Sequence, residues 1–260
     1  AIAKEIGALM KAGNKAGAEV AKTETSALKV STKELGETLA SLEEQVQGLL
    51  VTIPNLPHSS VPEGRTPDEN EVVLEHGEIP VLHEGAKPHW ELIQGFGPNG
   101  TPLIDFELGN KISGAGFPVY RGKGARIQRA MINFFLDRAL EAGYMEVQPP
   151  IMINEASGFG TGQLPDKEGQ MYYATDDKLY LIPTAEVPIT NLYRDVIVAE
   201  NDLPIKNTGY TPCFRREAGS WGSHVRGLNR LHQFDKVELV RIEKPENSYA
   251  ALEEMSLHVQ

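Results

Sequence analysis

The first fifty residues carry a heptad pattern of apolar side chains. Apolar residues recur every seven positions, and two more occupy the intervening core position: Ala21, Leu28, Leu35, Leu42 and Leu49, then Leu39 and Val46. This spacing is typical of a coiled-coil helix. Residues 13–17, which include two glycines, interrupt the pattern, so we expect a hairpin turn there. Most of the partner helix would then precede residue 1.

A linker and a second helix follow the arm. Residues 54–88 are rich in Pro, Gly, His and acidic side chains, which is typical of a linker packed over a domain surface. Residues 122–143 carry apolar side chains at helical spacing and end at a glycine, as helices often do. The apolar positions of this predicted helix are Ile127, Ala130, Met131, Phe134, Phe135 and Leu140.

Short β-prone stretches follow the predicted helix, at 144–153, 171–175, 179–182, 210–215 and 231–242. Several are too closely spaced for a crossover helix, which favours an antiparallel sheet over a doubly wound parallel one. We therefore expect an α+β fold, with an antiparallel sheet flanked by helices and preceded by a long antiparallel helical hairpin. The expected divisions are the arm at 1–52, the linker and start of the second domain at 53–120, and the core of that domain at 121–260.

Composition limits the class of protein. The chain has 260 residues, 40% of them hydrophobic and 23% charged, which excludes collagen-like and disordered chains. No apolar run approaches the roughly 20 residues that cross a bilayer, and no basic-then-apolar leader opens the chain, so we expect a soluble cytoplasmic protein. The single cysteine, Cys213, excludes an internal disulfide and a cysteine-based zinc site. Because the chain starts at Ala1 and stops at Gln260 inside a helical pattern, we expect a piece of a longer protein.

Charge is unevenly distributed. The net charge of −11 argues against a generally basic nucleic-acid-binding surface, but it does not exclude a local one. In the arm, lysines gather in the half that holds the turn: Lys4, Lys11, Lys15, Lys22, Lys29 and Lys33. Glutamates gather at the other end: Glu34, Glu37, Glu43 and Glu44. Two interpretations stay open, a solvated helical face or a basic tip that touches phosphates.

The stretch Phe214-Arg215-Arg216-Glu217 precedes a Gly- and Ser-rich loop and then Arg230-Leu231-His232-Gln233-Phe234. Because side chains alternate along a strand, Arg215 and Glu217 are expected on one face, and so are Phe234 and Glu238. A guanidinium can bind a phosphate, an aromatic ring can stack on a base, and a carboxylate can bind an amine or a metal. An isolated Arg-x-Glu is more often a charged hairpin face, whereas the complete arrangement is less common.

A second group of candidates lies in residues 182–188, Ile-Pro-Thr-Ala-Glu-Val-Pro. Thr184 and Glu186 together offer a carboxylate for an ammonium group and hydrogen-bonding partners for a hydroxyl. The same residues are a good helix start, with Thr as the N-cap and an acid in the first turn. Both interpretations can hold together.

The order Phe-Arg-x-Glu, variable loop and Arg-x-x-x-Phe resembles motif 2 of the class II aminoacyl-tRNA synthetases. Residues 211–220, 226–238 and 182–188 resemble the seryl-tRNA synthetases of the bacterial type. The helix at 122–143 with the strand that ends at Pro150 resembles motif 1, and residues 50–57 resemble the junction between arm and catalytic domain. The resemblance covers essentially the whole chain, while motif 3 would lie beyond Gln260.

The resemblance implies that L-serine is activated with ATP and Mg²⁺ to seryl-adenylate and then transferred to tRNA(Ser), with tRNA(Sec) as a second candidate. ATP and Mg²⁺ are the implied cofactors, and no zinc is expected. The arm is implied to bind tRNA, the motif 1 region to form a homodimer, and no membrane partner is expected. Two alternatives remain: a synthetase-like paralogue that charges a carrier protein, and a non-catalytic protein that recruits a partner through the coiled coil.

The resemblance also assigns roles to residues. Arg215 and Arg230 are the implied catalytic residues, and Arg215 would stabilise charge on the α-phosphate. The implied ATP contacts are Arg215, Arg216, Glu217, Leu231 and Phe234, with Glu217 on the adenine amino group and Phe234 stacked on the ring. The implied serine-binding residues are Thr184, Ala185, Glu186 and Glu238, and Glu238 is also a candidate magnesium ligand.

Overall fold

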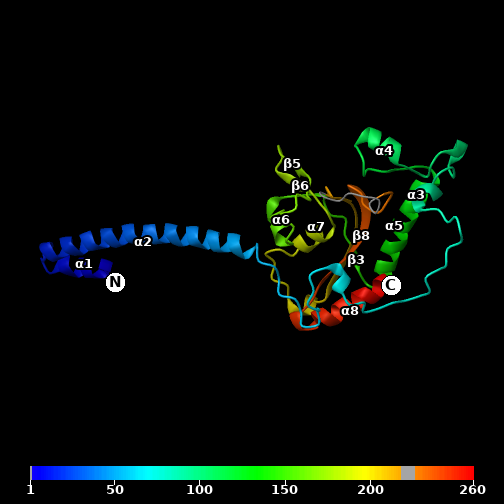
Figure 1. Ribbon diagram of the computed structural model, residues 1–260. Helices are drawn as coiled ribbons and strands as arrows, with labels where there is room; N and C mark the ends of the chain where they lie inside the picture. Colours follow the sequence, from blue (N-terminus) through cyan, green and yellow to red (C-terminus); the bar gives the residue numbers. More distant parts are fainter. Residues whose placement is uncertain (1, 218–225) are drawn as a thin grey trace. The chain divides into compact units, whose positions relative to one another are not determined.

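Gly13 and Asn14 end one amino-terminal helix and begin the next. In this computed structural model, which describes residues 2–217 and 226–260, α1 spans Ile2–Lys11 and α2 spans Lys15–Leu50 (Figure 1). Gly13 adopts a φ of 74°, a conformation that favours glycine. The Asn14 side chain accepts a 2.9 Å hydrogen bond from the Gly17 N–H, which caps α2. The predicted turn and long helix are confirmed.

Helix α1 covers only the first turns of α2. Ala18 and Ala21 are buried there. The heptad positions further along α2 are at least 48% exposed, so the described residues leave this apolar stripe open: Leu28, Leu35, Leu39, Leu42, Val46 and Leu49. Between α2 and residue 89 the chain forms no α-helix or strand and only one 3₁₀ turn, η1 at Pro67–Glu69.

The chain divides into two units, Ala1–Glu75 and His76–Gln260. The helices of the second unit are α3 (His89–Leu92), α4 (Phe106–Ile112), α5 (Lys123–Glu141), α6 (Glu155–Gly160), α7 (Glu186–Asn191) and α8 (Ser248–Val259), with 3₁₀ turns η2 (Pro98–Gly100), η3 (Glu200–Asp202) and η5 (Pro245–Asn247). Its strands are β1 (Ile104–Asp105), β2 (Val119–Tyr120), β3 (Met145–Glu146), β4 (Met152–Ile153), β5 (Tyr173–Ala174), β6 (Leu179–Leu181), β7 (Ile205–Phe214) and β8 (Gln233–Ile242). The α+β prediction is confirmed. Within the described residues, no helix is both long and apolar enough to cross a bilayer.

Strands β7 and β8 form the centre of the second unit. They pair antiparallel from Ile205↔Ile242 to Phe214↔Gln233, and the strand orders are β3-β7-β8, β4-β6-β5 and β1-β2. One pair corrects the antiparallel expectation, because β3 runs parallel to β7. The long stretch between these two strands gives the chain room to cross over. The β-prone stretch 144–153 also splits into β3 and β4 around Pro149 and Pro150, since proline has no N–H to donate.

Helices α5 and α7 pack on opposite faces of β7 and β8 (Figure 1). On the α5 face, the Gln128 amide contacts Asp235, and the Tyr210 hydroxyl donates to the same carboxylate at 2.6 Å. On the α7 face, Ile189 lies against Gly209, where an added Cβ would come within 2.8 Å of Ile189 Cδ1. Glycine therefore permits α7 to approach the middle of the sheet closely.

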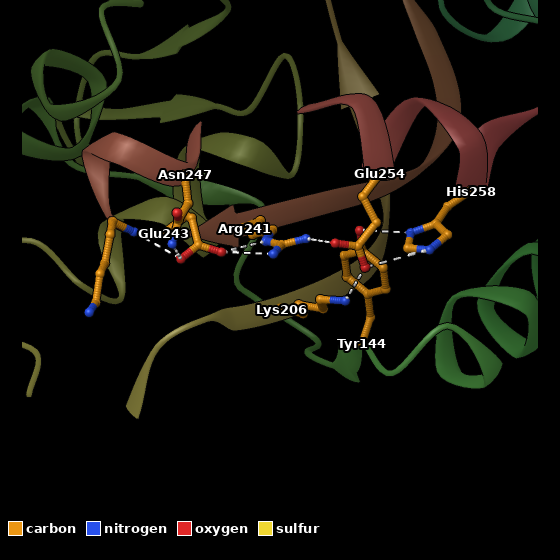
Figure 2. Close-up of polar contacts among 8 residues, drawn as sticks. Tyr144, Lys206, Arg241, Glu243, Asn247, Glu254 and His258 are labelled. Carbon is orange, nitrogen blue, oxygen red and sulfur yellow. Dashed lines mark hydrogen bonds and ion pairs between the residues drawn. The ribbon is translucent and has the colours of Figure 1, made fainter. Parts of the chain in front are cut away.

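A charged network joins α8 to the sheet (Figure 2). Glu254 of α8 accepts hydrogen bonds from Arg241 of β8 at 2.5 Å and from Lys206 of β7 at 2.7 Å. The Tyr144 hydroxyl lies 3.2 Å from His258 Nδ1 of the same helix. Because the Arg241 side chain is only 10% exposed, its ion pairs are shielded from solvent more than surface pairs are.

Replacement of Glu254 by glutamine should remove a pH-dependent part of the stability. Hydrogen bonds from Arg241 and then Lys206 lower the Glu254 pKa from 4.5 to about 2. A depressed folded-state pKa stabilises the fold above the unfolded value, and this contribution is lost as the pH falls from about 4.5 towards 2. The difference in Tm between wild type and E254Q, measured by circular dichroism, should therefore be largest near neutral pH and shrink over that interval. The same change at the exposed neighbour Glu253 serves as control, and a difference that does not depend on pH would contradict this role.

Candidate active site on strands β7 and β8

The face of β7 and β8 that α7 approaches carries a row of functional side chains. The facing pairs are Gly209 with Glu238, Thr211 with Lys236, and Cys213 with Phe234. Since alternate residues of a strand share a face, Phe234, Lys236 and Glu238 lie in line along β8. The prediction that Phe234 and Glu238 share a face is confirmed. Sequence reasoning did not single out Lys236, although the same alternation places it between them.

Arg215 lies at one end of this row, directly after β7. Its Nε donates a 3.3 Å hydrogen bond to the carbonyl oxygen of Pro183, and its guanidinium carbon lies 5.2 Å from the centre of the Phe234 ring. This is the distance range of a cation–π contact. The contact to the Pro183 carbonyl also connects Arg215 to the loop that carries Thr184. The guanidinium is thereby fixed beside the aromatic ring, and within the described residues its terminal nitrogens form no hydrogen bond or ion pair that would compete with an anion.

His232, which sequence reasoning did not assign to the site, holds the backbone of Arg215. The Arg215 N–H donates to the His232 carbonyl at 2.9 Å, and His232 Nδ1 lies 3.0 Å from the Arg215 carbonyl oxygen. Because a carbonyl only accepts, Nδ1 carries the proton in this contact. The imidazole stacks on Phe117 with centroids 5.4 Å apart. The backbone at Arg215 is thus fixed from both its N–H and its C=O, and the adjacent Leu231 is buried.

Thr184, Glu238 and Lys236 meet at a single carboxylate oxygen. The Thr184 hydroxyl donates to Glu238 Oε2 at 2.6 Å, and the Lys236 ammonium contacts the same oxygen. Thr184 Oγ1 also accepts the Glu186 N–H at 3.2 Å, so the residue acts both at the helix start and in the site, as the sequence allowed. Within the described part of the chain, no hydrogen bond or ion pair involves Glu238 Oε1, which leaves this oxygen available for a ligand.

The other two candidates for a serine pocket differ in position. The Glu186 side chain is exposed. The Ala185 side chain is fully buried in a cluster with Ile189 and Val240. Its methyl group therefore belongs to the hydrophobic core, and only the backbone of Ala185 is left for a ligand.

The remaining nucleotide-site candidates flank the loop after β7. Glu217 has a φ of 48°, so the chain has left the extended conformation, and the expectation that strand alternation places Glu217 with Arg215 is wrong. Arg230 Nη1 lies 3.5 Å from Glu217 Oε2, which brings both ends of the loop together. Arg216 has an exposed side chain, while its N–H donates to the Gln170 carbonyl at 2.8 Å. The loop residues 218–225, part of the predicted motif, lie outside the described residues.

The chemistry of the site limits the reaction it can perform. Cys213 lies opposite Phe234 on the neighbouring strand, and burial raises the pKa of its thiol. A buried protonated thiol is a poor nucleophile. Among the described residues, no group of three or more His, Cys, Asp or Glu side chains could hold a metal ion. The charged groups of Arg215, Lys236 and Glu238 and the ring of Phe234 suit positioning and electrostatic stabilisation of a substrate.

Comparisons with known proteins show what this chain is similar to. Residues 172–260 match the family model "tRNA synthetase class II core domain (G, H, P, S and T)". A serine–tRNA ligase of Salinibacter ruber is 50% identical over 252 residues, which cover 97% of this chain and 58% of that protein. A serine–tRNA ligase of Chlorobaculum parvum is 47% identical, over 100% of this chain and 60% of that protein. The chain is a homologue of the serine–tRNA ligases.

A solved structure supports the same relation. The crystal structure of seryl-tRNA synthetase from Pyrococcus horikoshii complexed with ATP superposes on this chain with a TM-score of 0.85 at 31% identity. The superposed region covers 98% of this chain and 60% of the synthetase chain. The chain therefore has the class II synthetase fold. It spans about 60% of the length of the curated serine–tRNA ligases that it matches.

Proposed function

We propose that the protein activates L-serine with ATP and transfers the seryl group to tRNA(Ser), in the cytoplasm. The observation that carries the proposal is the row on the α7 face of the sheet, with Arg215 and Phe234 at one end and Thr184 and Glu238 at the other. One end suits a nucleotide and the other suits a small polar amino acid. The relation to serine–tRNA ligases supports serine as that amino acid.

The residues of the row perform the first step by positioning and charge. A carboxylate oxygen of serine attacks the α-phosphorus of ATP, a new P–O bond forms, and the bond to the leaving pyrophosphate breaks. Arg215 binds the α-phosphate and stabilises the negative charge that grows on it, because its guanidinium is already fixed by Pro183 and Phe234. Phe234 stacks on the adenine, and Glu217 accepts from its amino group. Arg216, Arg230 and Leu231 border the nucleotide.

The serine pocket is proposed to consist of Thr184, Glu186, Glu238 and the backbone of Ala185. The free Oε1 of Glu238 can accept a hydrogen bond from the serine hydroxyl or ammonium group. Alanine would leave polar groups of the pocket unpaired, which is an effective basis for discrimination. Threonine must instead be excluded by its extra methyl group.

Magnesium is proposed to arrive with ATP. Mg²⁺ is commonly bound through one or two carboxylates together with substrate phosphates. Glu238, the sequence-derived candidate ligand, already contacts the Lys236 ammonium, and its other oxygen is proposed to bind the serine, so this carboxylate has little capacity left for a metal ion. The phosphates are therefore the better donors in this site.

The macromolecular partners are proposed from the surfaces of each unit. The lysines of the turn half of α1 and α2 suit the phosphates of a tRNA. On α5, five apolar side chains are between 44% and 54% exposed, which suits an interface with a second copy of the chain: Ile127, Met131, Phe134, Phe135 and Leu140.

Exchange of labelled pyrophosphate into ATP tests the proposed function. With the full-length gene product, we expect exchange that requires serine and is not supported by alanine, threonine or glycine. Charging of tRNA(Ser) should follow, and deletion of residues 1–50 should abolish tRNA binding while exchange persists. Exchange with a different amino acid and no binding of tRNA would favour a paralogue that charges a carrier protein. A complete absence of exchange would contradict the proposal.

A further inference from the structure

We propose that Lys236 binds the carboxylate of the amino-acid substrate. To do so, its ammonium leaves its present partner, the Glu238 carboxylate. The ion pair between the two residues would then be an internal substitute for an α-amino-acid zwitterion. This inference rests on the proposed function, since it concerns the amino acid that enters the same site.

The position of Lys236 in the strand is the first argument. Lys236 lies two residues from Phe234 and two from Glu238, so each step along the strand face is about 6.6 Å. Phe234 is proposed to hold the adenine, and Glu238 the amino acid. The bond between the serine carboxylate and the α-phosphate forms between these two ends, and Lys236 is the β8 side chain that lies between them on this face.

The pairing of charges is the second argument. Glu238 carries a negative charge and Lys236 a positive one, and their side chains are 21% and 31% exposed, so a ligand can reach both. Serine at neutral pH carries an ammonium and a carboxylate on the same carbon. Its ammonium or hydroxyl can engage Glu238 while its carboxylate engages Lys236, so both charges keep a partner. A substrate without the carboxylate would leave the Lys236 ammonium without this second partner.

The support around Glu238 is the third argument. The Thr184 hydroxyl donates to Glu238 Oε2, and the Thr208 hydroxyl donates to the Glu238 carbonyl at 3.0 Å. These contacts hold Glu238 in place without Lys236. Lys236 is therefore not required to position the Glu238 carboxylate, and its ammonium can change partner when substrate binds.

A comparison of serine with L-serinamide tests this role. Serinamide has the same shape and the same hydroxyl, but a neutral amide replaces its carboxylate. In full-length K236M, the KM for serine in pyrophosphate exchange should rise roughly tenfold to hundredfold, the range expected for a hydrogen bond between charged groups. The inhibition constant of serinamide should change by less than about threefold, because its amide forms no ion pair with Lys236. The lower basicity of the serinamide amine affects all variants alike and cancels in the comparison.

Two further variants complete the experiment. K236R keeps the positive charge and should restore most of the preference for serine over serinamide. K206M removes another lysine of the same sheet, one that pairs with Glu254 of α8, and it should leave the KM for serine unchanged. If K236M weakens serine and serinamide by the same factor, or leaves the KM for serine unchanged, the inference fails while the proposed function stands. If the wild type shows no serine-dependent exchange, the proposed function itself fails, and the inference with it.

Discussion

Replacement of Arg215 by alanine is expected to lower kcat/KM for serine-dependent pyrophosphate exchange by roughly 10²–10³-fold, the usual cost of removing one preorganised group that stabilises transition-state charge. The guanidinium is fixed before substrate arrives, by the Pro183 carbonyl at 3.3 Å and the Phe234 ring at 5.2 Å. The Arg215 side chain therefore does not have to be ordered during the reaction. The loss should therefore appear mainly in kcat, because the charge that Arg215 stabilises grows in the transition state.

Arg215→Lys separates charge from geometry. Lysine keeps the cation but has neither the planar shape nor the paired donors of a guanidinium, so we expect it to recover only part of the activity. Arg65→Ala, at an exposed arginine of the first unit, serves as the control for a general loss of positive charge. Circular dichroism checks that each variant folds. Wild-type kcat in Arg215→Ala would show that the α-phosphate is stabilised elsewhere.

The fold was predictable wherever a local pattern determines it. The heptads of α2, the glycine turn before it and the apolar spacing of α5 are periodic signals that need no tertiary information. The parallel pairing of β3 with β7 was not predictable in this way, because a parallel pair is joined by a long connection that leaves no turn signature. After β7 ends at Phe214, the Arg216 N–H bonds to the Gln170 carbonyl in another part of the chain, which a local pattern also does not reveal.

The candidate site, too, was predictable only where a local pattern determines it. Strand alternation predicted that Phe234 and Glu238 share a face, and the same alternation places Lys236 on that face as well. The contact between Thr184 and Glu238 joins residues 54 positions apart, and only the resemblance to a family linked them in advance. His232 gave no local signal, because its role is to bond to the backbone of Arg215. The sequence pattern therefore does not predict residues that act through such distant backbone contacts.

Replacement of Glu238 by alanine is expected to raise the KM for serine by roughly a hundredfold or more, since the loss of a hydrogen bond to a charged group alone costs about tenfold to hundredfold. Three contacts are lost with this one side chain. The Thr184 hydroxyl loses its 2.6 Å acceptor, the Lys236 ammonium loses its ion pair, and the substrate loses the open oxygen Oε1. The KM for ATP should change little, because Arg215 and Phe234 keep their mutual contact at the other end of the row.

Glu238→Gln tests whether charge or shape matters more at this position. The amide keeps an oxygen that can accept from Thr184, but it carries no charge for Lys236 or for the serine ammonium. We therefore expect a KM for serine between those of wild type and Glu238→Ala. Glu253→Ala, at an exposed glutamate on α8, controls for the change in net charge. Wild-type serine affinity in Glu238→Ala would remove Glu238 from the pocket. Equal rises in the KM values for serine and ATP would indicate instead that the whole β7–β8 face is disturbed, because Glu238 also faces Gly209, where the sheet and α7 approach closely.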